Sequence, residues 1–137
     1  MEFREIMAEG DLDRWLDLAQ TVVDNHNVEI MMPPEPCTAM LQAVDSVGCT
    51  PFYLGEVLMS EAAVAVNGVA GYGFALEDEP RRALCVAIID AALAAEVAEM
   101  ATIRQALEDE AARLRAQAKR EENLVAATKV NFAIMEG

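Results

Sequence analysis

The sequence has little positive charge, few aromatic residues and a single histidine. Its 137 residues include 10 Lys and Arg against 24 Asp and Glu, which gives a formal net charge of −14, and only 5% of the residues are aromatic. Residues 37–80 contain six acidic residues and no Lys or Arg. A surface of this kind repels phosphate groups, so we expect no nucleic-acid partner. An anionic substrate would need positive charge from another chain.

The sequence also lacks a disulfide pattern, a zinc motif and a membrane span. Cys37, Cys49 and Cys85 are odd in number and have neither CxxC nor zinc-site spacing. The longest uncharged run, 62–76, is too short and too rich in glycine to cross a bilayer. The first residues are acidic, whereas a secretory signal begins basic. We therefore expect a cytoplasmic protein without membrane contact.

Apolar spacing predicts two short helices between Phe3 and Val23, separated at Gly10-Asp11, with Asp11 as the N-cap of the second. Two strands are predicted next, at 28–32 and 38–44. The proline-rich stretch 32–36 between them reads as a rigid connection, since proline interrupts helices and central strands. A turn at 45–48 follows, and then a further apolar run at 52–59.

The strongest local signal is a hairpin around Asn67-Gly68. Residues 60–66 and 69–76 flank this dipeptide, which supplies the two positive φ angles of a type I′ turn. Gly71 and Gly73 lie two residues apart on one strand face, which favours close approach by another backbone or helix. No phosphate-binding glycine motif is present.

The C-terminal half is predicted to be helical. Pro80 suits the first position of an apolar helix that runs to about residue 95 and packs on the sheet. Apolar residues then recur at helical spacing from Leu93 to Val125 without a breaker, which predicts a helix that projects or packs on another chain. The apolar tail 129–135 reads as a last strand or an arm.

These elements define an α+β protein with a small antiparallel sheet of about four or five strands, packed helices and a long C-terminal helix. We expect a single domain over residues 1–137. Its parts are N-terminal helices at 1–27, a mainly β part at 28–78, a helical part at 79–125 and a C-terminal arm at 126–137.

Few residues offer chemistry. His26 lies in a polar stretch and is expected to be a solvated turn residue. The acidic clusters 77–79 and 108–110 lack the ligand spacing of a calcium loop, so we interpret them as a helix-dipole complement and a solvated helix face. We expect no cofactor and no metal site. Asp90 is the exception, because a carboxylate within an apolar helix needs a partner. That partner is either an internal arginine such as Arg4 or Arg14, or an arginine of another subunit.

A series of short motifs occurs in a fixed order along the chain: Phe52-Tyr53-Leu54-Gly55-Glu56, Glu61 to Val66, Gly68, Gly71-Tyr72-Gly73, Asp78-Glu79-Pro80, Arg82-Ala83, Ala87 to Ala91 and Thr128-Lys129-Val130-Asn131-Phe132. In their order and spacing, these motifs resemble the PhnG family, the G subunit of the carbon-phosphorus lyase core complex. The resemblance covers nearly the whole chain and is strongest from Phe52 to Ala92. The sequence departs from the family pattern at Phe3, where Trp is usual, and at Ala133, where a second aromatic residue is usual.

The resemblance implies a subunit of alpha-D-ribose 1-methylphosphonate 5-triphosphate synthase, which replaces the adenine of ATP with an alkylphosphonate at ribose C1 in phosphonate catabolism. It implies direct contact with the I subunit, within a core that also contains H and J, while an ATPase-like L subunit is needed as well. The nucleosidase chemistry belongs to the I subunit, so this chain would be a non-catalytic scaffold or activator. The residues assigned to partner contact or local structure are Gly55, Glu56, Gly71, Tyr72, Asp90, Val130, Asn131 and Phe132.

Two alternatives stay open at this point. The chain could itself supply an acid or base, Glu56 or Asp90, because leaving-group departure at an anomeric carbon benefits from a carboxylate. It could also be an acidic adaptor protein unrelated to phosphonates.

Overall fold

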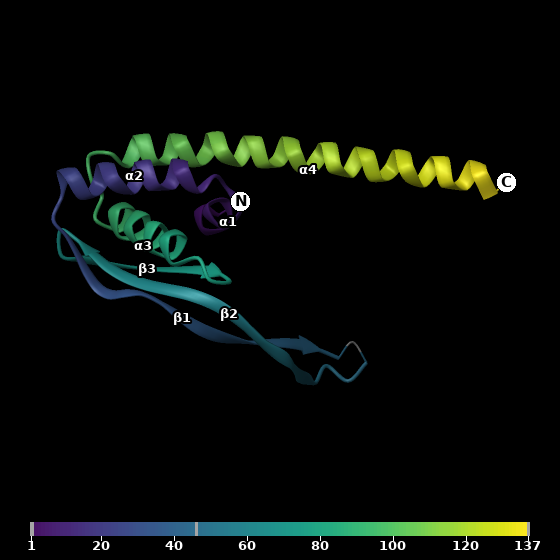
Figure 1. Cartoon of the computed structure of the whole chain (residues 1–137), viewed down its shortest axis with the longest axis horizontal. Helices are drawn as coiled ribbons and strands as arrows, with labels where there is room; N and C mark the ends of the chain where they lie inside the picture. The colour runs from purple at the N-terminus through teal and green to yellow at the C-terminus, as the bar shows by residue number, and fades with distance from the viewer. Residues whose placement is uncertain (1, 46, 137) are drawn as a thin grey trace.

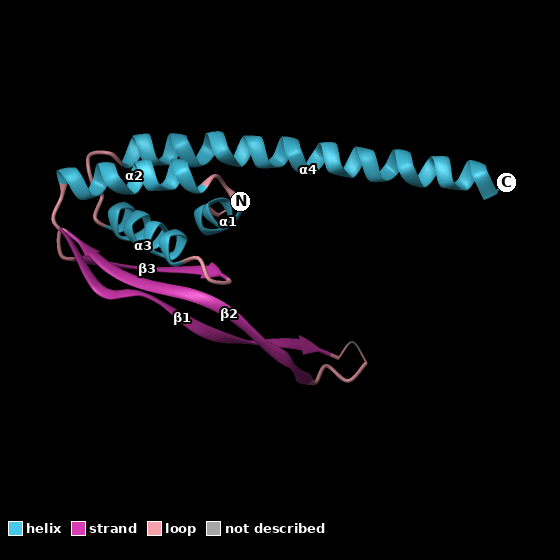
Figure 2. Ribbon diagram, in the orientation of Figure 1, coloured by secondary structure: helices cyan, strands magenta, loops and turns pink. Residues whose placement is uncertain are grey.

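The computed structural model describes residues 2–45 and 47–136, with side chains described as far as residue 127. Four helices and a three-stranded antiparallel sheet make up this part of the chain (Figures 1 and 2). In chain order they are α1 (Phe3–Glu9), α2 (Leu12–Asn25), β1 (Val28–Val44), β2 (Pro51–Val66), β3 (Val69–Leu76), α3 (Pro80–Ala94) and α4 (Met100–Glu136). The α+β class and the long C-terminal helix agree with the sequence prediction, whereas the expected four or five strands are three.

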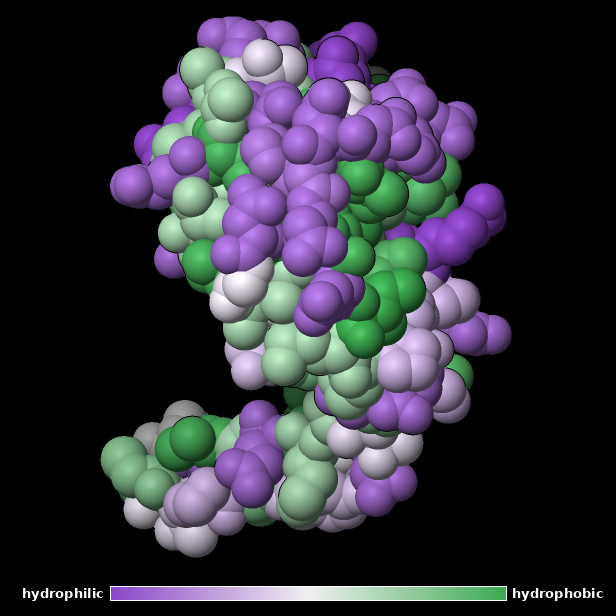
Figure 3. All heavy atoms as spheres, turned by 90° about the vertical axis from the view of Figure 1, so that its left-hand side faces the viewer, coloured by the Kyte–Doolittle hydropathy of each residue, from purple (hydrophilic) through white to green (hydrophobic). Residues whose placement is uncertain are grey.

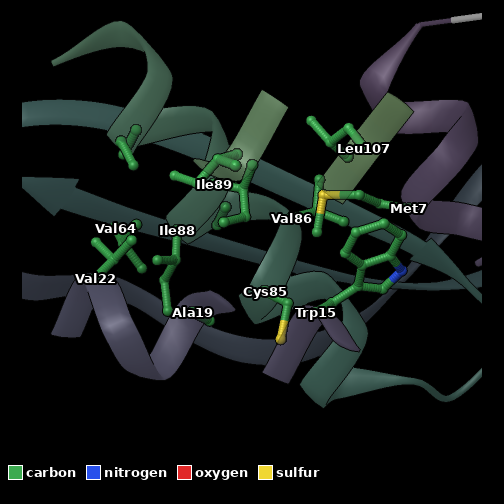
Figure 4. Close-up of a cluster of buried hydrophobic side chains, with 14 of the residues drawn as sticks. Met7, Trp15, Ala19, Val22, Val64, Cys85, Val86, Ile88, Ile89 and Leu107 are labelled. Carbon is green, nitrogen blue, oxygen red and sulfur yellow. The ribbon is translucent and has the colours of Figure 1, made fainter. Parts of the chain in front are cut away.

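The central helix α3 lies between the sheet and a layer made by α1, α2 and α4 (Figure 2). Its apolar composition follows from this position, because both of its sides are covered and eight of its residues are buried. Side chains from all the layers meet around it, including Trp15 from α2, Val64 from β2 and Leu107 from α4 (Figure 4). None of the helices in the described part has the length and apolar character needed to cross a membrane.

The prediction of two strands and a proline connection between residues 28 and 44 is wrong. The residues form one 17-residue strand, β1, which runs through the prolines. β1 is at the edge of the sheet, where an outward-facing proline removes no ladder hydrogen bond. Pro33 and Pro34 also lie where the register with β2 shifts, between Met32 and Glu35, so the irregular pairing accommodates them.

The connection between β2 and β3 consists of two residues, Asn67 and Gly68, with φ angles of 50° and 85°. Val66 lies opposite Val69 across this turn, and the register continues to Met59 opposite Leu76. β2 residues 51–58 extend beyond β3 and pair with β1 alone. This two-stranded extension, residues 38–44 and 51–58, is called the ribbon below; it projects beyond α3 and the end of β3, on the side of the molecule away from α4 (Figures 1 and 2).

The apolar helix predicted to run to about residue 95 is confirmed, whereas the long helix predicted from Leu93 begins later. α3 ends at Ala94 and α4 begins at Met100. Glu96 adopts a φ of 53° while Val97 N–H donates to the carbonyl of Ala92, which is the hydrogen-bond pattern of a Schellman C-cap. A glycine usually takes the position of Glu96, and because none is present the helical spacing from Leu93 onward showed no interruption before Met100. The tail at 129–135 lies within the bounds of α4, so the alternative of a last strand is wrong.

Candidate functional site

The partner of Asp90 within the chain is Arg4, which agrees with the first of the two alternatives, an internal arginine rather than one of another subunit. The Asp90 carboxylate lies 3.0 Å from the Arg4 guanidinium and also accepts a 2.9 Å hydrogen bond from the backbone N–H of Tyr72. Arg4 donates a second 2.9 Å hydrogen bond to the carbonyl of Tyr72. Both carboxylate and guanidinium are partly exposed, with 25% and 41% of the side chain accessible.

This arrangement closes the free edge of β3 at Tyr72. β3 pairs with β2 on one side, and its other side is an open edge of the sheet. Asp90 and Arg4 satisfy the N–H and C=O of the same residue, which is what a neighbouring strand would do. Unpaired edges invite pairing with other chains, and a charged cover prevents it at this position. Asp90 therefore has a structural task in the isolated chain.

Gly71 and Gly73 let α3 lie directly on β3, as their spacing predicted. A Cβ atom built on Gly71 would lie 2.3 Å from the backbone nitrogen of Ala91. One built on Gly73 would lie 2.0 Å from the carbonyl oxygen of Ala83. Real Cβ contacts are never this short, so any side chain here would push α3 off the sheet.

Glu56 and Gly55 lie far from Asp90, on the ribbon. Glu56 is exposed and pairs in register with Met40, whereas Tyr72, which binds Asp90, lies opposite Ala63. Seven residues of one strand separate Glu56 from Ala63, or about 23 Å at about 3.3 Å per residue. The structure thus does not bring the two candidate carboxylates together. Gly55 has a φ of 154° beside a register shift in the ribbon.

His26 is packed rather than solvated, contrary to the prediction. Its Nε2 lies 2.6 Å from the Glu99 carboxylate, and its Nδ1 lies 3.1 Å from the side-chain nitrogen of Asn67. Asn67 accepts from the backbone N–H of Asn27 through its oxygen, which orients its nitrogen toward His26. Nδ1 is then an acceptor and the ring hydrogen is on Nε2. The hydrogen bond from His26 holds the pKa of Glu99 below its usual value.

The cluster around His26 joins three segments that are distant in sequence: the end of α2, the β2–β3 turn and the connection before α4. Both ring nitrogens are occupied, so the ring is not available as a base in this conformation. The sequence did not predict this cluster, because Asn67 was expected only to form the turn and no motif includes Glu99.

Glu110 also departs from its prediction as part of a solvated helix face. Only 2% of this residue is exposed, and its carboxylate accepts hydrogen bonds from the Arg113 side chain and the backbone N–H of Asp11. Burial acts to raise the pKa of Glu110, but these two donors outweigh it and hold the pKa below its usual value. Glu110 thus ties α4 to the start of α2. In the other acidic cluster, Glu79 pairs with Arg82 at 2.8 Å.

The remaining predicted residues lie on α4. The side chains of Val130, Asn131 and Phe132 are outside the described residues. Among the described residues, no three His, Cys, Asp or Glu side chains gather closely enough to hold a metal ion.

Most of the exposed large apolar side chains among the described residues lie on the sheet. The helices cover one of its faces, while Tyr72, Phe74 and Leu76 stand exposed on the other face of β3. The ribbon adds further exposed apolar residues, namely Met40, Leu41, Val44, Phe52, Tyr53, Leu54 and Leu58. In Figure 3 the ribbon stands apart from the main body, at the bottom of the view, with hydrophobic residues on its surface. Exposed apolar areas of this extent mark interaction surfaces.

The fold and these surfaces define a class, a small α+β protein whose sheet is covered on one face and extended by an apolar ribbon. Residues 2–137 match the family model described as "Phosphonate metabolism protein PhnG". The chain is also 35% identical, over 122 residues, to a protein of Rhizobium meliloti (strain 1021) named alpha-D-ribose 1-methylphosphonate 5-triphosphate synthase subunit PhnG. This match covers 88% of the chain and 78% of that relative. The chain belongs to the PhnG family.

Proposed function

We propose that the protein is a non-catalytic subunit of the carbon-phosphorus lyase core complex, the ribose 1-methylphosphonate 5-triphosphate synthase. In this role it is needed with the I subunit to transfer an alkylphosphonate onto ribose C1 of ATP with release of adenine. Membership of the PhnG family and the name of the Rhizobium meliloti relative support this assignment. The assembly would work in the cytoplasm, where ATP is available.

The observation that carries the non-catalytic role is the engagement of Asp90. Its carboxylate is held by Arg4 and by the backbone of Tyr72, so it already has two partners within its own chain. His26 is similarly engaged by Glu99 and Asn67. Groups that are tied into the fold in this way stabilise the subunit, and the reacting groups are then expected on a partner.

The sheet supports direct contact with the I subunit, within a core that also contains H and J. Its uncovered face and the ribbon present apolar side chains to solvent in the isolated chain. ATP and the alkylphosphonate are substrates of the complex, and their negative charge is repelled by a chain with a net charge of −14. The positive groups that hold the triphosphate are therefore expected on the partner subunits.

A second candidate function rests on Glu56, which is an exposed carboxylate on the projecting ribbon. If the ribbon reaches the active site of a partner, Glu56 could act there as the acid or base of glycosidic cleavage. Glu56→Gln would then abolish transfer while leaving assembly intact.

Co-expression with the I, H and J subunits from the same genome tests the proposed function. We expect a stoichiometric complex on size exclusion, and adenine release that requires this chain once the L subunit, ATP and an alkylphosphonate are supplied. Failure to form any complex, or full activity without this chain, would refute the proposal.

A further inference from the structure

The ribbon lacks cover on both of its faces. Met40 and Leu41 are neighbours on one strand, so their side chains point to opposite faces of the ribbon. Nevertheless, Met40 is 65% exposed and Leu41 is 50% exposed. Seven of the large apolar residues of the ribbon, those named above, are each between 47% and 65% exposed. Isolated two-stranded hairpins are only marginally stable in water. Apolar residues on both faces fit a groove that encloses the ribbon rather than a single flat surface.

The root of the ribbon is fixed where β3 ends. The Ser60 hydroxyl donates to the carbonyl of Glu77 and accepts from the N–H of Glu79, each at 3.0 Å. Glu77 N–H also donates to the carbonyl of Leu58 at 2.8 Å. Ser60 itself is buried, so these bonds are shielded from water. The direction in which the ribbon leaves the body is thus set before a partner binds, which lowers the ordering cost of association.

The ribbon and the turn at its tip carry acidic residues and no basic ones. Asp45 follows directly after β1 and Glu56 lies within β2, while the chain has no Lys or Arg between Arg14 and Arg81. Two ribbons packed together would bring acidic groups near one another without any compensating base. A different protein with basic residues beside an apolar groove is the better match.

We propose that the ribbon inserts into an apolar groove of another subunit, whose Arg or Lys side chains at the rim face Asp45 and Glu56. The inference rests on the proposed function, because that function supplies the partner subunits. The apolar side chains provide the buried contact, and the acidic residues select the basic rim and favour fast association.

Affinity measurements with the co-expressed I–H–J assembly test the inference. The test variant Phe52→Thr/Leu54→Thr removes two apolar side chains while keeping residues that suit a strand. The matched control is Val23→Thr/Ile30→Thr, whose residues are also exposed but lie outside the ribbon. We expect the test variant to weaken binding by about 100-fold and the control to stay within about threefold of wild type. Unchanged fluorescence of the buried Trp15 verifies that each variant is folded.

A charge pair completes the experiment. Glu56→Arg should slow association, more so at low salt, whereas Asp17→Arg makes the same charge change on an exposed position of α2 and should have little effect. If wild type binds and all four variants bind equally well, the ribbon proposal is wrong while the proposed function stands. If the ribbon variants abolish only a homodimer of this chain, the partner is a second copy and the proposal is overturned. If wild type does not bind the assembly, both proposals fail.

Discussion

Substitution of Gly73 by alanine provides a sharp test of the packing between α3 and β3. The added Cβ would lie 2.0 Å from the carbonyl oxygen of Ala83 and 2.5 Å from the backbone nitrogen of Ala87. Ordinary contact begins near 3.4 Å, so Cβ and the Ala83 oxygen must separate by a further 1.4 Å. Both neighbouring atoms belong to the helix backbone, so a side-chain rotation cannot relieve the overlap.

The expected cost follows from the displacement of α3. Overpacking a core costs about 1–3 kcal/mol when side chains can adjust. Here a whole helix with eight buried residues must move, and a gap of 0.5–1 Å already forfeits about a quarter to a half of each dispersion contact. We expect Gly73→Ala to lower the free energy of unfolding by about 3 kcal/mol or more, after the smaller gain of about 0.4–1 kcal/mol from a stiffer unfolded chain.

Urea unfolding followed by the fluorescence of Trp15, which is fully buried, measures this loss. With a urea m-value of about 2 kcal/mol/M, the midpoint should fall by about 1.5 M. The matched control is Gly48→Ala in the turn after β1, where the added Cβ would meet only Thr50 Oγ1 and Asp45 Oδ2, at 3.4 Å and 3.6 Å. This control should stay within about 0.5 kcal/mol of wild type. If Gly73→Ala unfolds at the wild-type midpoint, α3 does not lie on β3 as described.

Three further predictions concern single groups. Asp90→Asn and Arg4→Met each remove the charge pair that covers the backbone of Tyr72. Because the pair is partly exposed, we expect each variant to lower the free energy of unfolding in urea by about 1–2 kcal/mol. Unchanged midpoints would show that the pair does not stabilise the fold. The hydrogen bond from His26 holds the folded-state pKa of Glu99 below its usual 4.5, so ionised Glu99 stabilises the fold above that pH, and this stabilisation is lost as the pH falls through the lower folded value. Glu99→Gln should therefore flatten the pH dependence of the free energy of unfolding below about pH 4.5. An unchanged slope would contradict the pairing with His26. Burial raises the pKa of Cys85 to about 11, whereas Cys49 is exposed. A thiol reagent at pH 8 should therefore label Cys49 in the folded protein and reach Cys85 only after urea is added. Labelling of Cys85 before urea is added would be inconsistent with its position in the core.

Local chemistry made several features predictable. The N-cap follows from the side-chain oxygen of Asp11, the helix start from the fixed φ of Pro80, and the close approach of α3 from the missing Cβ atoms of Gly71 and Gly73. An internal arginine as the partner of Asp90 was one of two alternatives, and the fold selected Arg4 because α1 lies beside the open edge of β3.

Long-range packing accounts for what the sequence did not reveal. The prolines of β1 were predicted to interrupt the strand. A strand tolerates them when it lies at the edge of a sheet, and that position is a property of the whole sheet. The long helix α4 begins at Met100 rather than near Leu93, because Glu96 adopts a conformation that usually requires glycine. Glu110 is buried where α4 meets the start of α2, and His26 is paired where the end of α2 meets the β2–β3 turn and the connection before α4. No periodicity in the sequence encodes either meeting point.

The most direct test of the central claim is the rate of adenine release by the assembled complex carrying the double substitution Glu56→Gln/Asp90→Asn. Native mass spectrometry would verify assembly, and the variant chain would be present at saturating concentration. If this chain is non-catalytic, the complex with the double substitution should release adenine at a rate within about threefold of wild type. A fall of about 100-fold or more in a complex of normal composition would contradict the claim, because it would place an essential carboxylate of the reaction on this chain.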